Sequence, residues 1–213
     1  MRIADPPLTE IGREQAEHAA AWLHEANLNA VALYASPMRR ALETARIVKA
    51  ALELPLNVLP DLCEADGMHI ERGLGHADIL KEWPDAILDA RIEESGWWTP
   101  TPDSEPEASL YARAARSLDA LRSRHLAEGH TLIIVTHGTF GSALVSSALG
   151  SGPCGYSRFV FNNCGISRLK FEESRQEAEP DTSSAEPWPS QMQEKVRLRF
   201  HNAVGHMPSN LLT

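Results

Sequence analysis

The sequence contains few cysteines and no long apolar run. No apolar stretch approaches the roughly 20 residues that a membrane-spanning helix needs, and the first residues lack the apolar core of a signal peptide. We therefore expect a cytoplasmic protein with no membrane partner. The three cysteines are odd in number and share no metal-ligand spacing, which favours reduced thiols over a disulfide framework.

Acidic residues outnumber basic residues, and this balance argues against a nucleic-acid partner. The 213 residues hold 29 acidic and 20 basic side chains, which gives a formal net charge of −9. A nucleic-acid-binding domain needs clustered lysine and arginine, and the sequence has no such cluster. We therefore expect no nucleic-acid partner, and an anionic ligand would have to be bound in a local pocket.

A β-branched apolar run begins at Thr131 and ends just before His137. Its length and composition predict a strand that is buried on both faces in the middle of a parallel sheet. Open α/β sheets bind ligands at the carboxyl ends of such strands, so His137 is a candidate for the centre of chemistry. Gly138 beside it permits close approach of a ligand or of backbone. The alternative is a strand-end histidine that only caps the sheet.

Two arginines stand at the start of a predicted helix. A short apolar strand over residues 31–35 ends at Ser36 and Pro37, which predict the N-cap and the first position of that helix. Arg39 and Arg40 then fall in its first turn, which is the unfavourable end of the helix dipole for a cation. They need an anion nearby, either an acidic side chain or a phosphate. The alternative is one solvated arginine and one ordinary salt bridge.

The rest of the chain alternates helices with strands, which predicts an α/β layered sheet in a single domain over residues 1–213. Further helices are expected near 10–25, 77–83, 104–127 and 140–149, and further strands near 54–59, 159–162, 165–171 and 195–201. Residues 67–102 are expected to run over the sheet edge as an excursion. Residues 172–190, rich in Glu, Ser and Pro, are expected to form a flexible loop.

Two further groups of side chains resemble site residues. Asp66, His69, Glu71 and His76 look superficially like metal ligands. Their spacing matches no metal site, so we interpret them as solvated polar residues and expect no metal. The pair Trp97-Trp98 either lines a pocket or clamps its loop against the sheet, and a clamp is the commoner use of such a pair.

Three segments, in this order, carry a family signature. The first is residues 5–16, which begin Asp5-Pro-Pro-Leu-Thr-Glu-Ile-Gly-Arg and end at Ala16. The second is residues 35–45, which begin Ala35-Ser-Pro-Met-Arg-Arg-Ala and end at Ala45. The third is Val135-Thr-His-Gly. Together they resemble the histidine phosphatase superfamily, the phosphoglycerate-mutase-like fold, over essentially the whole chain. The resemblance implies a three-layer α/β fold with a mostly parallel central sheet flanked by helices. It also implies an enzyme that transfers a phosphoryl group through a phosphohistidine and needs no metal or other cofactor.

The resemblance assigns roles to individual residues. It implies that Arg40 clamps the phosphate and that His137, with Gly138 beside it, hydrogen-bonds the phosphoryl group. A guanidinium fork matches two phosphoryl oxygens, which fits this role for Arg40. The proton donor falls on Glu64. Asp66 is its rival, because the glycine and tryptophan that often follow the family's acid are absent after Glu64.

The family's first strand has no counterpart in these residues. In the family that strand ends in Arg-His-Gly, whose histidine attacks phosphorus, and this sequence contains no such tripeptide. Loss of a central strand leaves the edges of its two neighbours without ladder partners. Either the start has been placed too far downstream in a complete enzyme, or this is a real truncated product. The intact match of the other segments favours the first explanation.

For the complete protein we expect a phosphatase rather than a mutase, because the chain is short and resembles the broad phosphatase branch. The expected substrate is a small phosphomonoester or a phosphoprotein. The alternative is a catalytically inactive domain that binds a phospho-ligand or a protein through Arg40 and His137. Substrate identity stays open, since phosphosugars, phosphoglycerate, nucleotides and phosphoproteins share the phosphoryl group that these residues contact. Oligomeric state is open as well.

Overall fold

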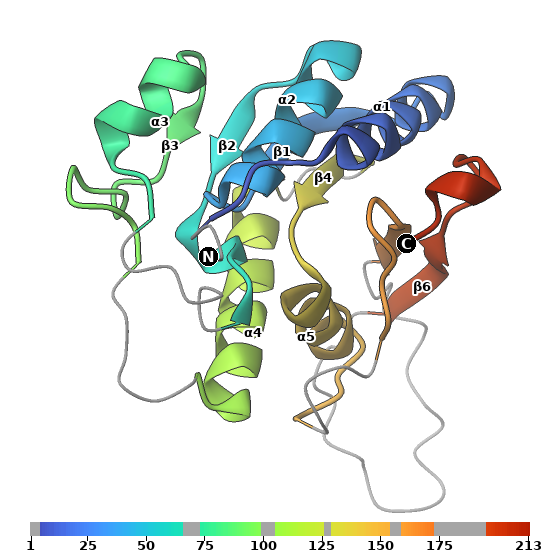
Figure 1. Ribbon diagram of the computed structural model, residues 1–213. Helices are drawn as coiled ribbons and strands as arrows, with labels where there is room; N and C mark the ends of the chain where they lie inside the picture. The colour runs from blue at the N-terminus through green and yellow to red at the C-terminus, as the bar shows by residue number, and fades with distance from the viewer. Residues whose placement is uncertain (1–4, 66–72, 99–104, 126–128, 154–158, 173–194) are drawn as a thin grey trace, which may run out of the picture.

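The computed structural model describes residues 5–65, 73–98, 105–125, 129–153, 159–172 and 195–213. Its centre is a parallel four-stranded sheet of order β3-β2-β1-β4 (Figure 1). The strands are β1 (Ala30–Ala35), β2 (Leu56–Val58), β3 (Ile87–Leu88) and β4 (Thr131–Val135). Parallel pairing brings the carboxyl ends of β1 and β4 together, which is where the candidate residues follow in sequence.

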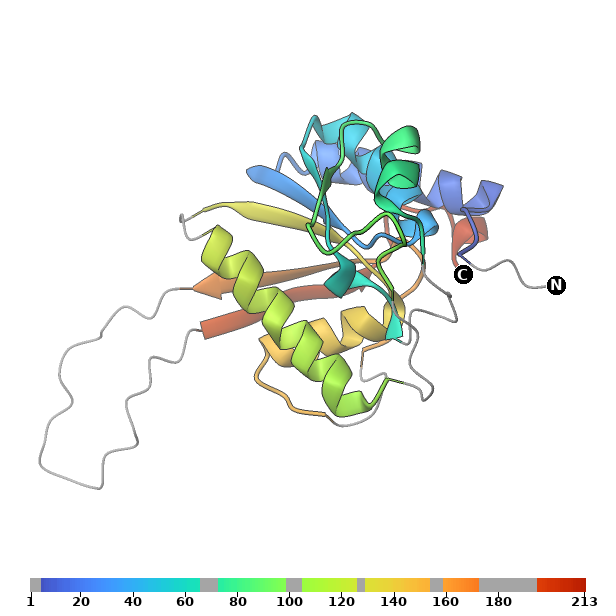
Figure 2. The same ribbon diagram turned by 90° about the vertical axis from the view of Figure 1, so that its left-hand side faces the viewer.

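Helices cover both faces of this sheet and give the expected three-layer α/β fold. One face carries α1 (Glu10–Glu25), α2 (Arg39–Leu52) and α3 (His76–Glu82), and the other carries α4 (Glu107–Arg124) and α5 (Gly138–Ala148) (Figure 2). The described residues also form two short 3-10 helices, η1 (Pro60–Leu62) and η3 (Ser209–Leu211). None of the described helices is both long and apolar enough to cross a membrane.

Two hydrophobic cores form because successive side chains of a strand point to opposite faces. In β1, Leu33 and Ala35 join the core beneath α1, α2 and α3. Ala32 and Tyr34 join the core beneath α4 and α5. The short strand β1, which the sequence predicts as an apolar strand, is therefore buried on both sides.

The sheet is interrupted beyond β4. Strands β5 (Ile166–Glu172) and β6 (Lys195–Ala203) form a separate antiparallel hairpin on the side of β4 away from β1 (Figures 1 and 2). No described strand pairs with the outer edge of β4. The sequence of β4 predicts burial on both faces, yet only Ile133 is buried and its four neighbours in the strand are half-buried. The partial burial of an apolar strand is the consequence of that open edge.

Helix α2 begins later than the sequence predicts. Its first residue is Arg39 and its N-cap is Met38, whereas Ser36 was expected to cap it. The Ser36 hydroxyl does accept the N–H of Met38, at 3.2 Å, but the N–H of Arg39 donates to the carboxylate of Asp5, at 2.9 Å. A carboxylate distant in sequence therefore takes part of the capping role, and no local pattern predicts that.

Two expected features of the loops are wrong. Residues 87–88 pair with β2 and extend the sheet, so this part of the excursion is an edge strand. Residues 159–162 form no strand, because the N–H of Phe159 donates to the Ser142 hydroxyl on α5, at 2.9 Å, instead of to a ladder. The expected loop over 172–190 begins with Glu172, which belongs to β5, and residues 173–190 lie outside the described part of the chain.

The tryptophan pair acts as a clamp. The side chain of Trp97 is buried and meets the ring of Trp98 edge to face, with 6.1 Å between centroids. Gly73 has a φ of +72°, and a Cβ there would come within 2.1 Å of the Trp97 ring. Glycine is therefore required for the backbone to lie on the indole, which pins residues 73–98 to the core.

Alternate residues of β4 face the open edge. The carbonyl of Val135 accepts the N–H of Ser36, which follows β1, at 3.0 Å. Residues two apart in a strand direct their backbone groups to the same side, so Ile133 also faces β1. Leu132 and Ile134 then direct their N–H and C=O groups away from β1, toward the side on which no described strand lies.

We expect the amides of Leu132 and Ile134 to exchange with deuterium at least about tenfold faster than those of Ile133 and Val135, because only the latter pair is held in a ladder. Residue-resolved hydrogen exchange followed by NMR measures this difference within a single strand. Equal protection of all four amides would show instead that the outer edge of β4 is covered.

Candidate functional site

His137 lies at the carboxyl edge of the sheet, as its position after β4 predicts. It is the N-cap residue of α5, and its Nε2 lies 2.8 Å from the hydroxyl oxygen of Ser36. Ser36 follows β1 directly and is fully buried. This hydrogen bond therefore joins the ends of two neighbouring strands and fixes the plane of the imidazole.

The surroundings of His137 keep its ring neutral. Its pKa is lowered well below the ordinary value, first by burial and then by the positive charges of Arg40 and Arg113. The Ser36 hydroxyl already accepts the N–H of Met38, so its own hydrogen can be donated to Nε2 of the neutral ring. In the tautomer that accepts this hydrogen, the ring hydrogen sits on Nδ1, and His137 is then a hydrogen-bond donor through that atom.

The two arginines at the start of α2 have different partners. Arg39 makes a bidentate ion pair with Glu82, at 2.6 and 2.7 Å, and its guanidinium lies 5.8 Å from the centre of the Trp83 ring. It therefore matches the alternative of an arginine held by an acidic side chain, and it fastens α2 to α3.

Arg40 makes no ion pair with any described residue. It is half-buried, and the one hydrogen bond that its guanidinium makes with described residues goes to the thioether of Met38, at 3.5 Å. Burial lowers the pKa of Arg40, while the carboxylates of Asp5 and Glu64 act in the opposite direction. A partly buried cation without a paired anion is costly, so an anionic ligand at this position would offset that cost.

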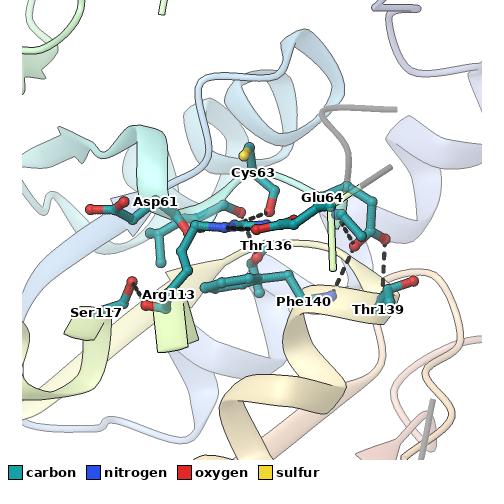
Figure 3. Close-up of polar contacts among 11 residues, drawn as sticks. Asp61, Cys63, Glu64, Arg113, Ser117, Thr136, Thr139 and Phe140 are labelled. Atoms are coloured by element: carbon teal, nitrogen blue, oxygen red, sulfur yellow. Dashed lines mark hydrogen bonds and ion pairs between the residues drawn. The ribbon is translucent and has the colours of Figure 1, made fainter. Parts of the chain in front are cut away.

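Glu64 holds the N-terminus of α5. One carboxylate oxygen accepts the N–H groups of Ala65, at 2.9 Å, and Phe140, at 2.8 Å, and the other accepts the N–H of Thr139, at 3.1 Å (Figure 3). A carboxylate at the first turn satisfies N–H groups that have no partner within the helix and also complements the helix dipole. Glu64 is thereby placed beside His137 and Gly138. Its rival Asp66 lies outside the described residues.

Arg113 supports this arrangement from α4. Its guanidinium donates to the carbonyls of Asp61 and Cys63, both at 2.8 Å, and forms a bidentate ion pair with Glu105, at 2.9 and 2.6 Å (Figure 3). It also stacks over the ring of Phe140, 4.5 Å from the centroid. One buried side chain thus fixes the loop that carries Glu64 against the helix that Glu64 caps.

Sequence reasoning missed Arg113. The only available signal was its place on the apolar face of the predicted helix, one turn after Leu110 and beside Ala114. A charged residue on a buried helical stripe requires a partner, but nothing in the sequence indicates which one.

Cys63 is no rival nucleophile, although it precedes Glu64. Its thiol is buried, and burial raises its pKa to about 12. The half-buried Cys164 has a pKa raised by burial to about 11. Both thiols are protonated at neutral pH and hence poorly nucleophilic. Cys154 lies outside the described part of the chain.

The four residues that resemble metal ligands give no cluster in the described part of the chain. Asp66, His69 and Glu71 lie outside it, and the Nδ1 of His76 is 3.8 Å from the carboxylate of Glu94. Within the described residues, no three His, Cys, Asp or Glu side chains are grouped so that they could hold a metal ion.

Asp5 is a further polar residue of this region. Its Oδ1 accepts the N–H of Arg39, while its Oδ2 is buried and has no hydrogen-bond partner among the described residues. Burial raises the pKa of Asp5, and the nearby positive charges of Arg39 and Arg40 limit that rise. Sequence reasoning placed Asp5 in a signature segment but gave it no role in the site.

The structure therefore brings three of the candidate residues to one edge of the sheet. Arg40 enters from α2, His137 from the end of β4 and Glu64 from the loop after η1, and the charges of Arg40 act on both of the others. Gly138 begins α5, and apart from its own helix backbone and chain neighbours no described atom lies within 4 Å of where its Cβ would be. The cation of Arg40 and the neutral imidazole of His137 form a site suited to an oxyanion, with the Glu64 carboxylate beside it as a candidate proton donor.

Comparisons with known proteins agree with this fold. The sequence model of the histidine phosphatase superfamily (branch 1) matches residues 2–180. The probable phosphoglycerate mutase GpmB of Enterobacter sp. (strain 638) is 31% identical over 181 residues, which are 80% of this chain and 76% of the relative. The corresponding protein of Proteus mirabilis (strain HI4320) is 27% identical over 176 residues, with the same coverage.

Solved structures share the fold. A mycobacterial glucosyl-3-phosphoglycerate phosphatase in complex with VO3 gives a TM-score of 0.63 at 23% identity, over 94% of this chain and 88% of that chain. The product of open reading frame Rv3214 of Mycobacterium tuberculosis gives a TM-score of 0.60 at 26% identity, over 94% and 86%.

The depressed pKa of His137 predicts a loss of stability in mild acid. Below about pH 6.5 the unfolded chain binds a proton at this residue that the folded protein does not, so the free energy of unfolding falls as pH decreases toward the folded pKa. In urea unfolding between pH 6.5 and 5, His137 should contribute up to about 1.4 kcal/mol per pH unit to the fall in the free energy of unfolding. We expect His137→Gln to remove this contribution. The exposed His130→Gln is the control for loss of a histidine, and an unchanged slope in His137→Gln would contradict the prediction.

Removing Arg113 should destabilise the fold strongly. In Arg113→Met the carbonyls of Asp61 and Cys63 and the carboxylate of Glu105 lose the guanidinium, so we expect the free energy of unfolding to drop by about 3–5 kcal/mol in urea titrations. Arg116→Met, at an exposed position of the same helix, is the matched control. A loss of similar size in both variants would mean that the Arg113 contacts contribute nothing specific.

Proposed function

Since the chain belongs to the histidine phosphatase superfamily (branch 1), we propose that it provides the phosphate-binding site of a phosphatase that acts on phosphomonoesters. The observation that carries this proposal is the half-buried guanidinium of Arg40, which makes no ion pair with the described residues and lies beside a neutral His137. An ester phosphate is the kind of anion that such a fork and a ring N–H bind together.

The phosphoryl group is held by donors that need no rearrangement. The guanidinium of Arg40 takes two of its oxygens, and the Nδ1 hydrogen of His137 takes the third. The hydrogen bond from Ser36 holds His137 in this orientation. Fixed donors in a partly buried site stabilise charge as it redistributes over the phosphoryl oxygens during transfer.

Glu64 is the proposed proton donor to the leaving oxygen. It lies next to the phosphate donors, with its carboxylate directed at the start of α5. Because both of its oxygens accept N–H groups, Glu64 must exchange at least one of these hydrogen bonds for the leaving oxygen when it acts as the acid. Asp66 is the second candidate for this step.

The attacking histidine is proposed to come from a strand that the 213 residues do not include, seated between β4 and β5. The open outer edge of β4 and the partial burial of its apolar side chains support this position, which lies beside His137. The imidazole would attack phosphorus as the ester P–O bond breaks and Glu64 protonates the departing oxygen. Water would then take the phosphoryl group from the histidine.

A second candidate is a domain that binds a phospho-ligand or a protein without turnover. The observation in its favour is that no histidine of the sequence stands between an arginine and a glycine. Binding and turnover separate the two candidates.

Calorimetric titration with inorganic phosphate tests the site. We expect Arg40→Ala to weaken phosphate binding at least about tenfold, because a charged pair of hydrogen bonds is lost. Arg39→Ala is the matched control and should keep the phosphate affinity, since the Arg39 guanidinium is bound to Glu82. Equal losses in the two variants, or none in either, would rule out Arg40 as the phosphate clamp.

Release of phosphate from p-nitrophenyl phosphate distinguishes the two functions. Turnover by the 213 residues, or by the chain with a preceding strand that ends in Arg-His-Gly, supports the phosphatase if it disappears in His137→Ala. Phosphate binding by the 213 residues without turnover, both before and after addition of a preceding strand that ends in Arg-His-Gly, supports the binding domain.

A further inference from the structure

A pocket of about 220 Å³ opens beside the proposed acid. One side is formed by Glu64 and by Gly138 and Thr139 at the start of α5. The other side is formed by three consecutive apolar residues, 159–161. The pocket thus lies where the leaving group of a phosphate ester would lie if its oxygen faced Glu64.

The apolar wall of this pocket is held on two sides. The ring of Phe161 lies against Gly141 of α5, where a Cβ would come within 3.4 Å of it. His201 of β6 holds the carbonyl of Val160 at 2.9 Å and meets the rings of Phe159 and Phe161 edge to face, with centroids 5.2 and 4.7 Å away. The segment is therefore a fixed wall, although it belongs to no strand.

The end of this wall is open to a ligand. The side chain of Val160 is 72% exposed, the largest value among the exposed large apolar residues of the described chain. An apolar side chain in the lining of a pocket gains most from an apolar partner that displaces water.

The described lining of the pocket offers no cation to a second anionic group. Among the described residues that line the pocket, Glu64 is the only one with an ionisable side chain. Of the described guanidinium groups in contact with this region, Arg40 is assigned to the phosphoryl group and Arg113 is bound to Glu105 and two carbonyls. A carboxylate on the leaving group would therefore lose its hydration against an apolar wall without a described cation to replace it, which discriminates against such a substrate.

We infer that this pocket binds an uncharged, apolar leaving group about the size of one aromatic ring, and that the substrates are aryl or similarly apolar phosphomonoesters rather than phosphorylated sugar acids. The inference rests on the proposed function. The volume fits, since an apolar cavity of about 150 Å³ is enough to hold benzene, whereas larger ligands occupy pockets of about 300 Å³ or more.

Binding of three phosphonates to the 213-residue chain tests the inference without any need for turnover. The probes are methylphosphonate, phenylphosphonate and 3-phosphonopropionate, which share the phosphoryl group and differ in what lies beside it. In calorimetric titrations we expect phenylphosphonate to bind at least about tenfold more tightly than the other two, because only its ring buries apolar surface against residues 159–161.

Two variants at Val160 sharpen the test, since this exposed position tolerates substitution. Val160→Ser should reduce the advantage of phenylphosphonate about threefold or more and leave methylphosphonate unchanged. Val160→Lys should bring the affinity for 3-phosphonopropionate above that for methylphosphonate. Ile87→Ser, at an apolar position of β3 that is 56% exposed, is the matched control and should change no affinity.

The outcomes separate the two levels of the proposal. The inference about the leaving group is wrong if all three phosphonates bind equally, or if 3-phosphonopropionate binds best to the unchanged chain. The phosphate site still stands in either case, provided that Arg40→Ala abolishes all binding. If no phosphonate binds, the proposed function fails and the inference falls with it.

Discussion

The carboxylate of Glu64 at the first turn of α5 is the contact on which the candidate site depends. It satisfies N–H groups of Thr139 and Phe140 that the helix cannot satisfy itself, and so fixes where α5 begins. Because His137 is the N-cap of that helix, the same contact sets the position of the imidazole. Arg113 holds the loop from the other side, so the site is defined by buried ion pairs and hydrogen bonds rather than by the strands alone.

Two arginines that are adjacent in sequence illustrate how tertiary contacts divide roles. Arg39 is neutralised by Glu82 and joins two helices, whereas Arg40 remains partly buried without a carboxylate partner among the described residues. The energetic cost of an unpaired guanidinium persists only where something else offsets it. In the proposed function the phosphate of the substrate pairs with Arg40. The unpaired charge that destabilises the empty site therefore favours the site with substrate bound.

The sequence predicts much of this, because apolar periodicity is local. The run that precedes His137, the strand before Ser36 and the layered α/β fold follow from patterns within about ten residues. What it does not predict depends on partners distant in the chain. Which of Arg39 and Arg40 pairs with a carboxylate depends on the position of Glu82. The role of Arg113 depends on carbonyl groups that lie some 50 residues before it in the sequence. Even the start of α2 depends on a carboxylate 34 residues earlier.

The interruption of the sheet has a consequence for how the molecule unfolds. The β5–β6 hairpin shares no ladder with the described four-stranded sheet and is joined to it through side chains, such as the edge-to-face contact of Trp22 on α1 with Phe200, 6.0 Å between centroids. Weakly joined segments open as separate cooperative units. We therefore expect the hairpin to open separately from the main sheet, and a strand seated between them would join the two.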